Sequence, residues 1–406
     1  MPLWLSSNLL SKLEQGSCDM RSLCSLSPTL VMPLWLSSYS DCFVSNRSGV
    51  QLPSEAFNSI TIKNQPLFFY KMDKETEQLI EKAGKVYSEN FSMTTCFERA
   101  IFFSWWCGIN DCGFCFMSAL PKEKTAKETA IRHESSILAE TWLCRKLGWE
   151  FGFFTGGINA FNADKIESML EKINKVYGEK VWISLGPIPK KLLERYKPYV
   201  KGVVGSVETI NEDVHKKACP SKPINPYLKM FETANEIGMK TAMTLIIGLG
   251  ETKDDFDKLV NFIKKYHISK IHIYGLIPHK GTVYSDADIP SAEYQAWWIA
   301  KTRIEFPRID IQCGIWSDRI ERTSLLLKAG ANSISKLPVF RKFGTKISYD
   351  LEEQTKLAGR EFLGSLTKMP EIDFDEIDRF GFDEELTVKI KKKAKQYIKI
   401  MKKNIQ

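Results

Sequence analysis

The sequence predicts an α/β fold of the (β/α)8 barrel type, because eight apolar, strand-like runs alternate with helical segments. Strands joined through helices form parallel pairs with right-handed crossovers. An open doubly wound sheet is the alternative fold, but no Gly-x-Gly-x-x-Gly motif follows the first run. The strands are expected near residues 96–106, 149–155, 180–185, 201–207, 240–247, 270–277, 308–313 and 331–334.

Helical periodicity appears before the first strand and between the others. We therefore expect the barrel to occupy residues 72–345, with a helical extension at 346–406. The helices are expected near residues 73–90, 124–147, 162–177, 189–197, 224–238, 252–266, 291–305 and 319–329.

Residues 1–71 differ in composition from the rest of the chain. They are rich in Ser and Leu, and Met-Pro-Leu-Trp-Leu-Ser-Ser occurs at 1–7 and again at 32–38. The segment lacks the basic start and the continuous apolar core of a signal peptide. We expect it to be a disordered leader or to come from an artefactual upstream start, with the native chain starting at Met72.

The net charge of +8 is explained by the C-terminus, where residues 386–406 hold eight lysines and no acidic residue. Apolar residues are interleaved with these lysines, which is typical of an amphipathic helix with a solvated face. An anionic partner for that helix is the alternative, and nucleic-acid binding is not expected. No stretch approaches the roughly 20 apolar residues that a membrane helix needs.

Three of the ten cysteines lie in Cys107-Gly-Ile-Asn-Asp-Cys112-Gly-Phe-Cys115, directly after the first strand-like run. Thiolates are soft ligands that suit iron–sulfur clusters and zinc. Three cysteines can hold a cluster with one open iron, whereas a structural zinc site takes four protein ligands. The three cysteines therefore predict an iron–sulfur cluster, and the alternatives are a zinc site or unligated core cysteines. The other cysteines are scattered without a disulfide framework, which fits a reducing cytosol.

Further candidate residues follow the ends of other predicted strands. Functional groups of a parallel barrel gather at the carboxyl ends of its strands, here called the rim. Five motifs would meet there: Cys107, Thr155-Gly156-Gly157, Glu208, Gly248-Leu-Gly250-Glu251 and Pro278-His-Lys-Gly-Thr282.

Over residues 96–338, these motifs resemble radical S-adenosylmethionine (radical SAM) enzymes. The similar branch contains biotin synthase, the hydrogenase maturase HydE, methylornithine synthase and HmdB. The resemblance implies that Cys107, Cys112 and Cys115 hold one 4Fe-4S cluster, whose open iron binds S-adenosyl-L-methionine (SAM). An electron from the cluster would then cleave SAM to methionine and a 5′-deoxyadenosyl radical, which abstracts a substrate hydrogen.

The resemblance also assigns the SAM contacts. Phe114 matches an aromatic residue near the adenine, and Gly248 and Gly250 match a motif that lies along the adenine. Thr155, Gly156 and Gly157 match the motif at the methionine end of SAM, where a side chain would block the approach. Glu208 matches an acid that binds the ribose or the amino group. The alternatives are a tight turn at the glycines and an ion pair of Glu208 with a nearby Lys or Arg.

The cysteines depart from the family pattern in two ways, and both departures limit which reaction is expected. The spacing C-x4-C-x2-C has one residue more than the usual C-x3-C-x2-C, an expansion that HmdB shares. Biotin synthase holds a second, sulfur-donating cluster with cysteines whose counterparts here are Phe154 or Thr155, Trp182 and Ala242. Sulfur insertion is therefore not expected.

The resemblance favours an HmdB-like enzyme of cofactor biosynthesis, linked to the iron-guanylylpyridinol cofactor of a methanogen hydrogenase. The alternatives are HydE-like or methylornithine synthase-like chemistry, a non-catalytic iron–sulfur scaffold and an electron-transfer protein. We expect a cytoplasmic enzyme with a small-molecule substrate and a reductant such as ferredoxin or flavodoxin. Five polar residues could reach the barrel lumen, although each has a structural role as its alternative: His133, His272, Tyr274, His279 and Lys280.

Overall fold

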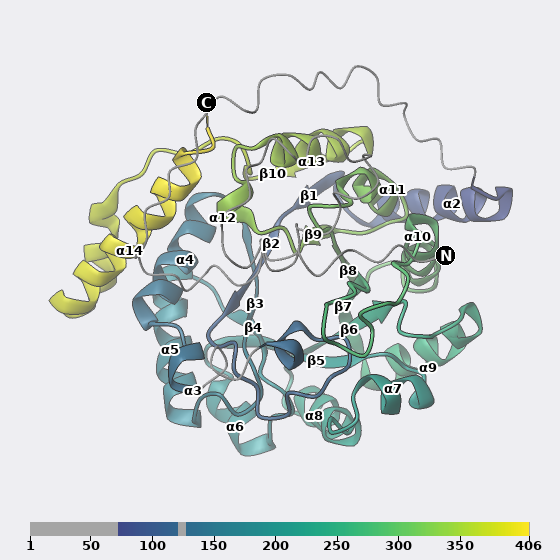
Figure 1. The fold of residues 1–406 in the computed structure, drawn as a ribbon, viewed down its shortest axis with the longest axis horizontal. Coiled ribbons are helices and arrows are strands. Elements are labelled where there is room, and N and C mark those ends of the chain that lie inside the picture. The colour runs from purple at the N-terminus through teal and green to yellow at the C-terminus, as the bar shows by residue number, and fades with distance from the viewer. Residues whose placement is uncertain (1–71, 121–126, 406) are drawn as a thin grey trace, which may run out of the picture. The chain divides into compact units, whose positions relative to one another are not determined.

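The computed structural model describes residues 72–120 and 127–405, so the predicted extension at 1–71 lies outside the described residues. Figure 1 shows a ring of strands surrounded by helices. Eight parallel strands pair in chain order, which confirms the predicted barrel class. They are β2 (Glu98–Phe102), β3 (Glu150–Thr155), β4 (Val181–Ser184), β5 (Val200–Glu208), β6 (Lys240–Ile247), β7 (Ile268–Gly275), β8 (Asp310–Gly314) and β9 (Ser333–Ser335).

The barrel is only partly closed. The last strand, β9, meets the start of the first at an isolated parallel bridge between Phe97 and Ile334. Each predicted helix has a counterpart outside the ring: α2 (Lys74–Asn90), α4 (Glu134–Lys146), α5 (Ala163–Tyr177), α6 (Lys190–Tyr196), α8 (Asn225–Glu236), α9 (Phe256–Tyr266), α10 (Ala292–Glu305) and α11 (Thr323–Lys328).

Helix α5 shows why these segments form where they do. Its first turn is capped by the Asn162 side chain, which accepts a hydrogen bond of 2.9 Å from the Lys165 N–H. Gly178 ends the helix with a left-handed φ of 93°. Between the two caps, residues such as Ile166 and Ile173 recur on one face and are buried against the sheet.

The helix predicted at 124–147 is interrupted, so that prediction was wrong in its continuity. A short helix, α3 (Lys127–Ala130), is followed by an antiparallel bridge between Ile131 and Ser104 before α4 begins. Arg132 holds this break, because its N–H donates to the Phe103 carbonyl at 2.8 Å. A tertiary contact with the strand therefore outweighs the helical periodicity.

The predicted first strand at 96–106 is also divided. Cys96 belongs to β1 (Thr94–Cys96), which pairs with β10 (Glu361–Leu363) in a separate two-stranded sheet. This sheet joins residues that are far apart in the chain, so periodicity could not reveal it. Two helices were likewise not predicted: α7 (Glu212–Ala218) and α12 (Val339–Lys342). A further helix, α13 (Lys346–Leu357), lies within the helical extension expected at 346–406.

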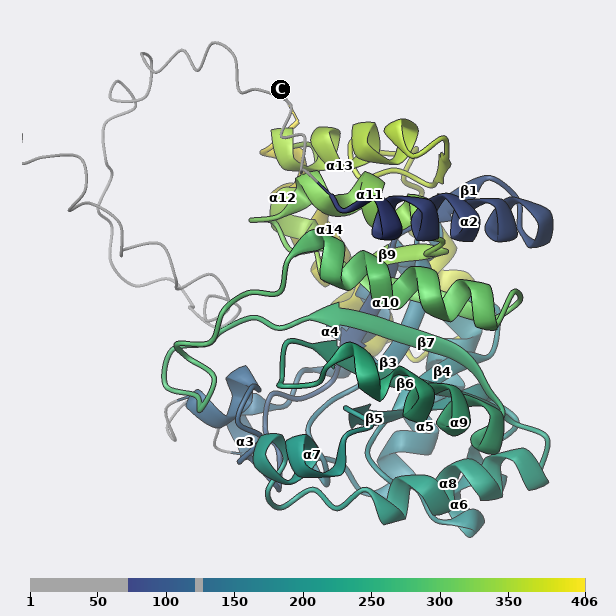
Figure 2. The same cartoon turned by 90° about the vertical axis from the view of Figure 1, so that its right-hand side faces the viewer.

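The predicted Lys-rich helix is present as α14 (Glu384–Lys402), which lies beside α4 (Figures 1 and 2). Its buried residues, among them Ile390 and Ile398, join the same hydrophobic core as the barrel. The Tyr397 ring stacks on Phe340 at 4.5 Å, and its hydroxyl accepts a hydrogen bond from Arg132 at 3.0 Å. The helix thus buries one face and exposes its lysines.

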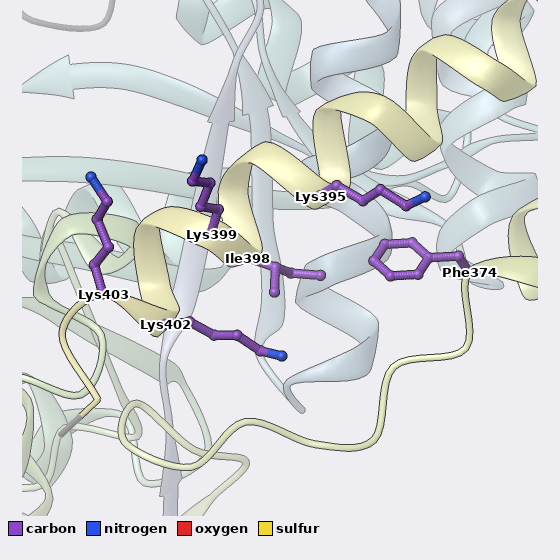
Figure 3. Close-up of a pocket in the computed structure, with 6 residues that line it drawn as sticks. All are labelled: Phe374, Lys395, Ile398, Lys399, Lys402 and Lys403. Atoms are coloured by element: carbon purple, nitrogen blue, oxygen red, sulfur yellow. The ribbon is translucent and has the colours of Figure 1, made fainter.

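The exposed side of α14 borders an open surface depression (Figure 3). The depression is lined by two apolar side chains and four lysines: Phe374, Ile398, Lys395, Lys399, Lys402 and Lys403. In the part of the chain that the structure describes, no helix combines the length and the apolar character needed to cross a membrane.

Buried charges occupy the amino-terminal end of the barrel lumen. The Glu98 carboxylate accepts hydrogen bonds from Lys270 Nζ at 2.6 Å and from the side chains of Gln312 and Ser333. Lys270 also contacts Asp310 at 2.8 Å. Burial by itself would raise the pKa of Glu98, but the charge of Lys270 and the hydrogen bonds from Lys270, Ser333 and Gln312 together outweigh burial and hold that pKa below its usual value.

We expect Lys270→Met to destabilise the fold by about 3–5 kcal/mol, because it leaves the Glu98 carboxylate buried without its cation. Urea unfolding at neutral pH measures this loss. Folding lowers the pKa of Glu98 from its usual value of 4.5. The ion pair therefore stabilises the fold fully above pH 4.5, and this stability is lost as the pH falls from 4.5 through the lower pKa of the folded state. The difference from the unchanged chain should therefore shrink in acid.

Lys264→Met is the matched control, because Lys264 forms a surface ion pair with Glu305 at 2.7 Å. Exposed pairs contribute about 0–1 kcal/mol. Equal effects of the two substitutions would show that the lumen pair is not needed for the fold.

Candidate active site

The motifs predicted for the rim lie there together, because all eight strands run in the same direction. The cysteine loop, residues 107–115, comes after β2. Thr155 and Glu208 are the last residues of β3 and β5, and Gly248 directly follows β6. The structure thus places the predicted metal ligands and the predicted SAM contacts at one end of the barrel.

Hydrogen bonds to its own backbone hold the cysteine loop. The Cys115 N–H donates to the Cys112 carbonyl at 3.0 Å. The Ser118 hydroxyl donates to both of these residues' carbonyls, at 2.9 and 2.7 Å. The Gly113 N–H donates to the Ala218 carbonyl at 2.8 Å, which ties the loop to α7. The loop therefore has a defined shape before any ligand binds.

The donors in this loop fit an iron–sulfur cluster. Cys107, Cys112 and Cys115 are free thiols and are partly exposed. A hydrogen bond from Cys219 and the charge of Lys222 lower the pKa of Cys112, whereas burial raises the pKa of Cys115 to about 12. Thiolates are the ligands that such clusters take.

In the residues that the structure describes, a site for a single metal ion is not seen. Within the described ranges, no three His, Cys, Asp or Glu side chains converge on one metal ion. A four-iron cluster does not require such convergence, because each thiolate binds a different iron.

Cys219, one of the cysteines that are scattered along the sequence, lies next to the cysteine loop. Its thiol is hydrogen-bonded to Cys112, and it is buried in a small apolar cluster with Leu249, Leu276 and Tyr284. Cys219 follows the last residue of α7, a helix that was not predicted. The ligand set therefore needs an experimental test that includes this fourth thiol.

The two glycines after β3 are required by contact with the strand and loop beside them. A Cβ on Gly157 would lie 1.6 Å from the Trp106 carbonyl oxygen and 2.5 Å from the Cys107 Cα. A Cβ on Gly156 would lie 2.6 Å from the Phe103 ring. Neither glycine is among the residues with positive φ, so close approach and not turn geometry explains them.

The same segment also bonds to the cysteine loop, where the Gly108 N–H donates to the Ile158 carbonyl at 2.9 Å. Thr155 is buried, and its hydroxyl donates to the Ser184 carbonyl at 2.9 Å. The motif thus supports the backbone at the first cysteine. Its approach to SAM stays a prediction.

Glu208 is buried at the end of β5, with a left-handed φ of 68°. One carboxylate oxygen accepts a hydrogen bond from Lys222 Nζ at 2.9 Å, and the other accepts one from the Thr244 hydroxyl at 2.9 Å. This is the ion pair that the alternative interpretation expected. Each carboxylate oxygen can accept a second hydrogen bond, so a ligand contact is also possible.

Phe114 joins the same group, because Lys222 Nζ lies 5.9 Å from the centre of its ring. Lys222 is buried and contacts both Phe114, the predicted aromatic contact of SAM, and Glu208, the predicted acidic contact. No sequence pattern marked Lys222, which lies in the loop between α7 and α8.

The glycines after β6 adopt conformations that other residues rarely adopt, with φ of 101° at Gly248 and 125° at Gly250. The Glu251 carboxylate accepts hydrogen bonds from the backbone N–H groups of Gly248 at 2.7 Å, Leu249 at 3.0 Å and Gly250 at 3.3 Å. Glu251 therefore shapes this loop from within.

The five polar candidates for the lumen divide into two groups. His272 and Tyr274 are buried on β7, and His279 is half-buried with its ring 5.9 Å from that of Phe116. His133 is exposed at the amino-terminal cap of α4, and Lys280 is exposed after β7. A further residue, Lys336, follows β9 at the rim and was missed, although its place after the last strand could have marked it.

Comparison with known proteins agrees with this geometry. The family model described as the radical SAM superfamily matches residues 103–263. The uncharacterized protein MJ0597 of Methanocaldococcus jannaschii is 34% identical over 298 residues, which cover 72% of this chain and 82% of that protein. Biotin synthase of Thermotoga neapolitana is 27% identical over 180 residues, which cover 43% of this chain and 64% of that protein.

Solved structures share the fold at low sequence identity. Methylornithine synthase (PylB) superposes with a TM-score of 0.60 at 16% identity, covering 71% of this chain and 90% of that one. The maturase HydG of Carboxydothermus hydrogenoformans superposes with a TM-score of 0.58 at 16% identity, covering 83% and 87%. With three cysteines on the loop after the first barrel strand and a match that spans most of a relative, the chain belongs to the radical SAM superfamily and is an enzyme of that family.

Proposed function

We propose that this radical SAM enzyme binds one 4Fe-4S cluster through Cys107, Cys112 and Cys115 and uses it with SAM in cofactor biosynthesis. The observation that carries the proposal is the cysteine loop at the rim, with Gly157 packed directly on its first cysteine. When bound, the cluster and SAM would supply a 5′-deoxyadenosyl radical for hydrogen abstraction, through reductive cleavage of SAM.

The residues of this chain have separate tasks in the proposal. The Gly156–Gly157 backbone supports the cysteine loop and leaves room for the methionine end of SAM. Phe114 and the loop of Gly248 and Gly250 border the adenine, and Glu208 accepts hydrogen bonds from the ribose or the ammonium group. Tight backbone packing keeps these groups in place before SAM binds.

The lumen argues against sulfur insertion. Phe153, Trp182, Val204 and Ala242 form a buried cluster separate from the main core, while their chain neighbours pack outward. These inward positions hold no cysteine. On β3, Phe153 faces the lumen, whereas Phe154, the counterpart expected from the sequence, belongs to the main core.

The subgroup proposed is the HmdB-like one, which acts toward an iron-guanylylpyridinol cofactor. Its support is the expanded cysteine spacing and the Cys-Phe-Met-Ser118 continuation. A small-molecule substrate, a ferredoxin or flavodoxin as reductant and a reducing cytoplasm complete the proposal. The free thiols fit that compartment.

Anaerobic reconstitution with iron and sulfide, followed by dithionite and SAM, tests the proposal. The expected product is 5′-deoxyadenosine. A chain that assembles a cluster but forms none would be a scaffold or an electron-transfer protein.

We expect Glu208→Gln to weaken SAM binding about tenfold or more. A charge-assisted hydrogen bond contributes about 1.5–3 kcal/mol, and each ~1.4 kcal/mol is a factor of ten. The cluster should still assemble, because no cysteine changes. Titration of SAM against the EPR signal of the reduced cluster measures the affinity.

Glu98→Gln is the matched control. Glu98 is a buried carboxylate that also pairs with a lysine, Lys270 at 2.6 Å, but it lies at the opposite, amino-terminal end of the barrel. Both substitutions weaken an ion pair, so both should lower thermal stability. If Glu208→Gln lowers stability but leaves SAM affinity unchanged, Glu208 serves only Lys222.

A further inference from the structure

Lys336 stands out among the charged side chains at the rim. It directly follows β9 and has a left-handed φ of 74°, as Glu208 does at the end of β5. Non-glycine residues held in this conformation cluster at functional sites. Its Nζ lies 4.2 Å from the centre of the Tyr274 ring and 6.0 Å from that of Trp316.

The surroundings of Lys336 are built to admit its side chain. A Cβ on Gly314, the last residue of β8, would lie 2.7 Å from Tyr274 Cδ1 and 3.1 Å from Lys336 Cγ. A glycine at this position therefore lets both side chains lie over the strand. Below them, the buried His272 ring is parallel to the Tyr274 ring and forms no hydrogen bond through either nitrogen.

The two lysines that are more deeply buried, Lys222 and Lys270, are neutralised. Lys222 pairs with Glu208, and Lys270 pairs with Glu98 and Asp310. Within the described ranges, no carboxylate lies within ion-pair distance of Lys336. Burial lowers the pKa of Lys336 to about 8, which leaves the amine mostly charged at neutral pH. The charges of Glu208 and Cys115 act on Lys336 from a distance, but a partly buried cation without an ion-pair partner is stabilised further when an anion binds beside it.

We propose that Lys336 binds a carboxylate group of a ligand at the rim, as a specificity-determining residue of this enzyme. The inference rests on the proposed function, since the ligand is either SAM, through its methionine carboxylate, or the substrate. One unpaired lysine matches a monoanion, whereas a phosphate dianion would call for more positive partners. The ring of Tyr274 holds the ammonium group by a cation–π contact and so fixes its position.

The first experiment measures SAM affinity by EPR in reconstituted protein with Lys336→Met and Lys336→Arg. If the carboxylate belongs to SAM, Lys336→Met binds SAM about tenfold or more weakly, and Lys336→Arg restores much of the affinity. Lys253→Met is the matched control, because Lys253 also packs on a ring, Trp297 at 5.0 Å, but is exposed on the outer surface.

The second experiment uses the unchanged, reconstituted chain with SAM bound. Reductive methylation of Lys336 is followed by peptide mass spectrometry in acetate, in acetamide and in chloride at equal ionic strength. If the carboxylate belongs to the substrate, acetate slows methylation of Lys336 several-fold, acetamide does not, and Lys253 is unaffected by either.

The proposal is overturned if Lys336→Met leaves SAM affinity unchanged and acetate protects Lys336 no better than acetamide. Iron content and 5′-deoxyadenosine formation by the unchanged chain report the proposed function. A sample that holds its iron and forms 5′-deoxyadenosine but passes neither Lys336 test contradicts only the Lys336 proposal, whereas a sample without iron or without this product contradicts the proposed function.

Discussion

Replacing Cys107, Cys112 and Cys115 together with alanine is expected to remove the iron from the reconstituted chain and to abolish formation of 5′-deoxyadenosine. The three thiols lie on one loop, and alanine offers no metal ligand. Iron analysis and Mössbauer spectra should give about four irons per unchanged chain, as one 4Fe-4S cluster requires. A cluster that survives the triple replacement would contradict the ligand assignment.

Cys219→Ala is the informative control, because the Cys219 thiol is hydrogen-bonded to Cys112. We expect this variant to keep its iron and to cleave SAM. Cys313→Ala, at a buried thiol on β8, serves as a second control. Loss of iron in Cys219→Ala alone would make Cys219 a ligand and would leave no open iron for SAM.

Gly157→Ala is expected to have the next largest effect. The new Cβ would meet the Trp106 carbonyl oxygen at 1.6 Å, a distance that requires the backbone before Cys107 to move. Overpacking of this kind costs about 1–3 kcal/mol. Because the displaced atoms lead into the first ligand, we expect the variant to lose most of its iron while circular dichroism shows an intact barrel.

Gly178→Ala provides the comparison. Gly178 has a φ of 93°, but a Cβ there would have no atom within 4 Å. This change strains only the end of α5, at a cost of about 1 kcal/mol, and should leave the iron content unchanged. Full iron content and normal SAM-dependent EPR changes in Gly157→Ala would show that the loop can move without harm.

The sequence by itself determined the class of fold and the place of the site. Alternating strand and helix periodicities identified all eight strands, since each element's pattern depends on local spacing. The cysteine spacing marked the loop that is proposed to bind the cluster. The rule that parallel strands end at one edge then brought Thr155, Glu208 and Gly248 to the same rim.

Only the tertiary structure decided what these residues contact. Gly157 is explained by the backbone before Cys107, and Glu208 by Lys222 and Thr244. The sheet of β1 and β10 and the break before α4 came from contacts that override local periodicity. Lys336 became a candidate only when the structure showed that Lys222 and Lys270 are paired with carboxylates and Lys336 is not. Such contacts join residues far apart in the chain, and their register depends on side-chain packing that periodicity does not encode.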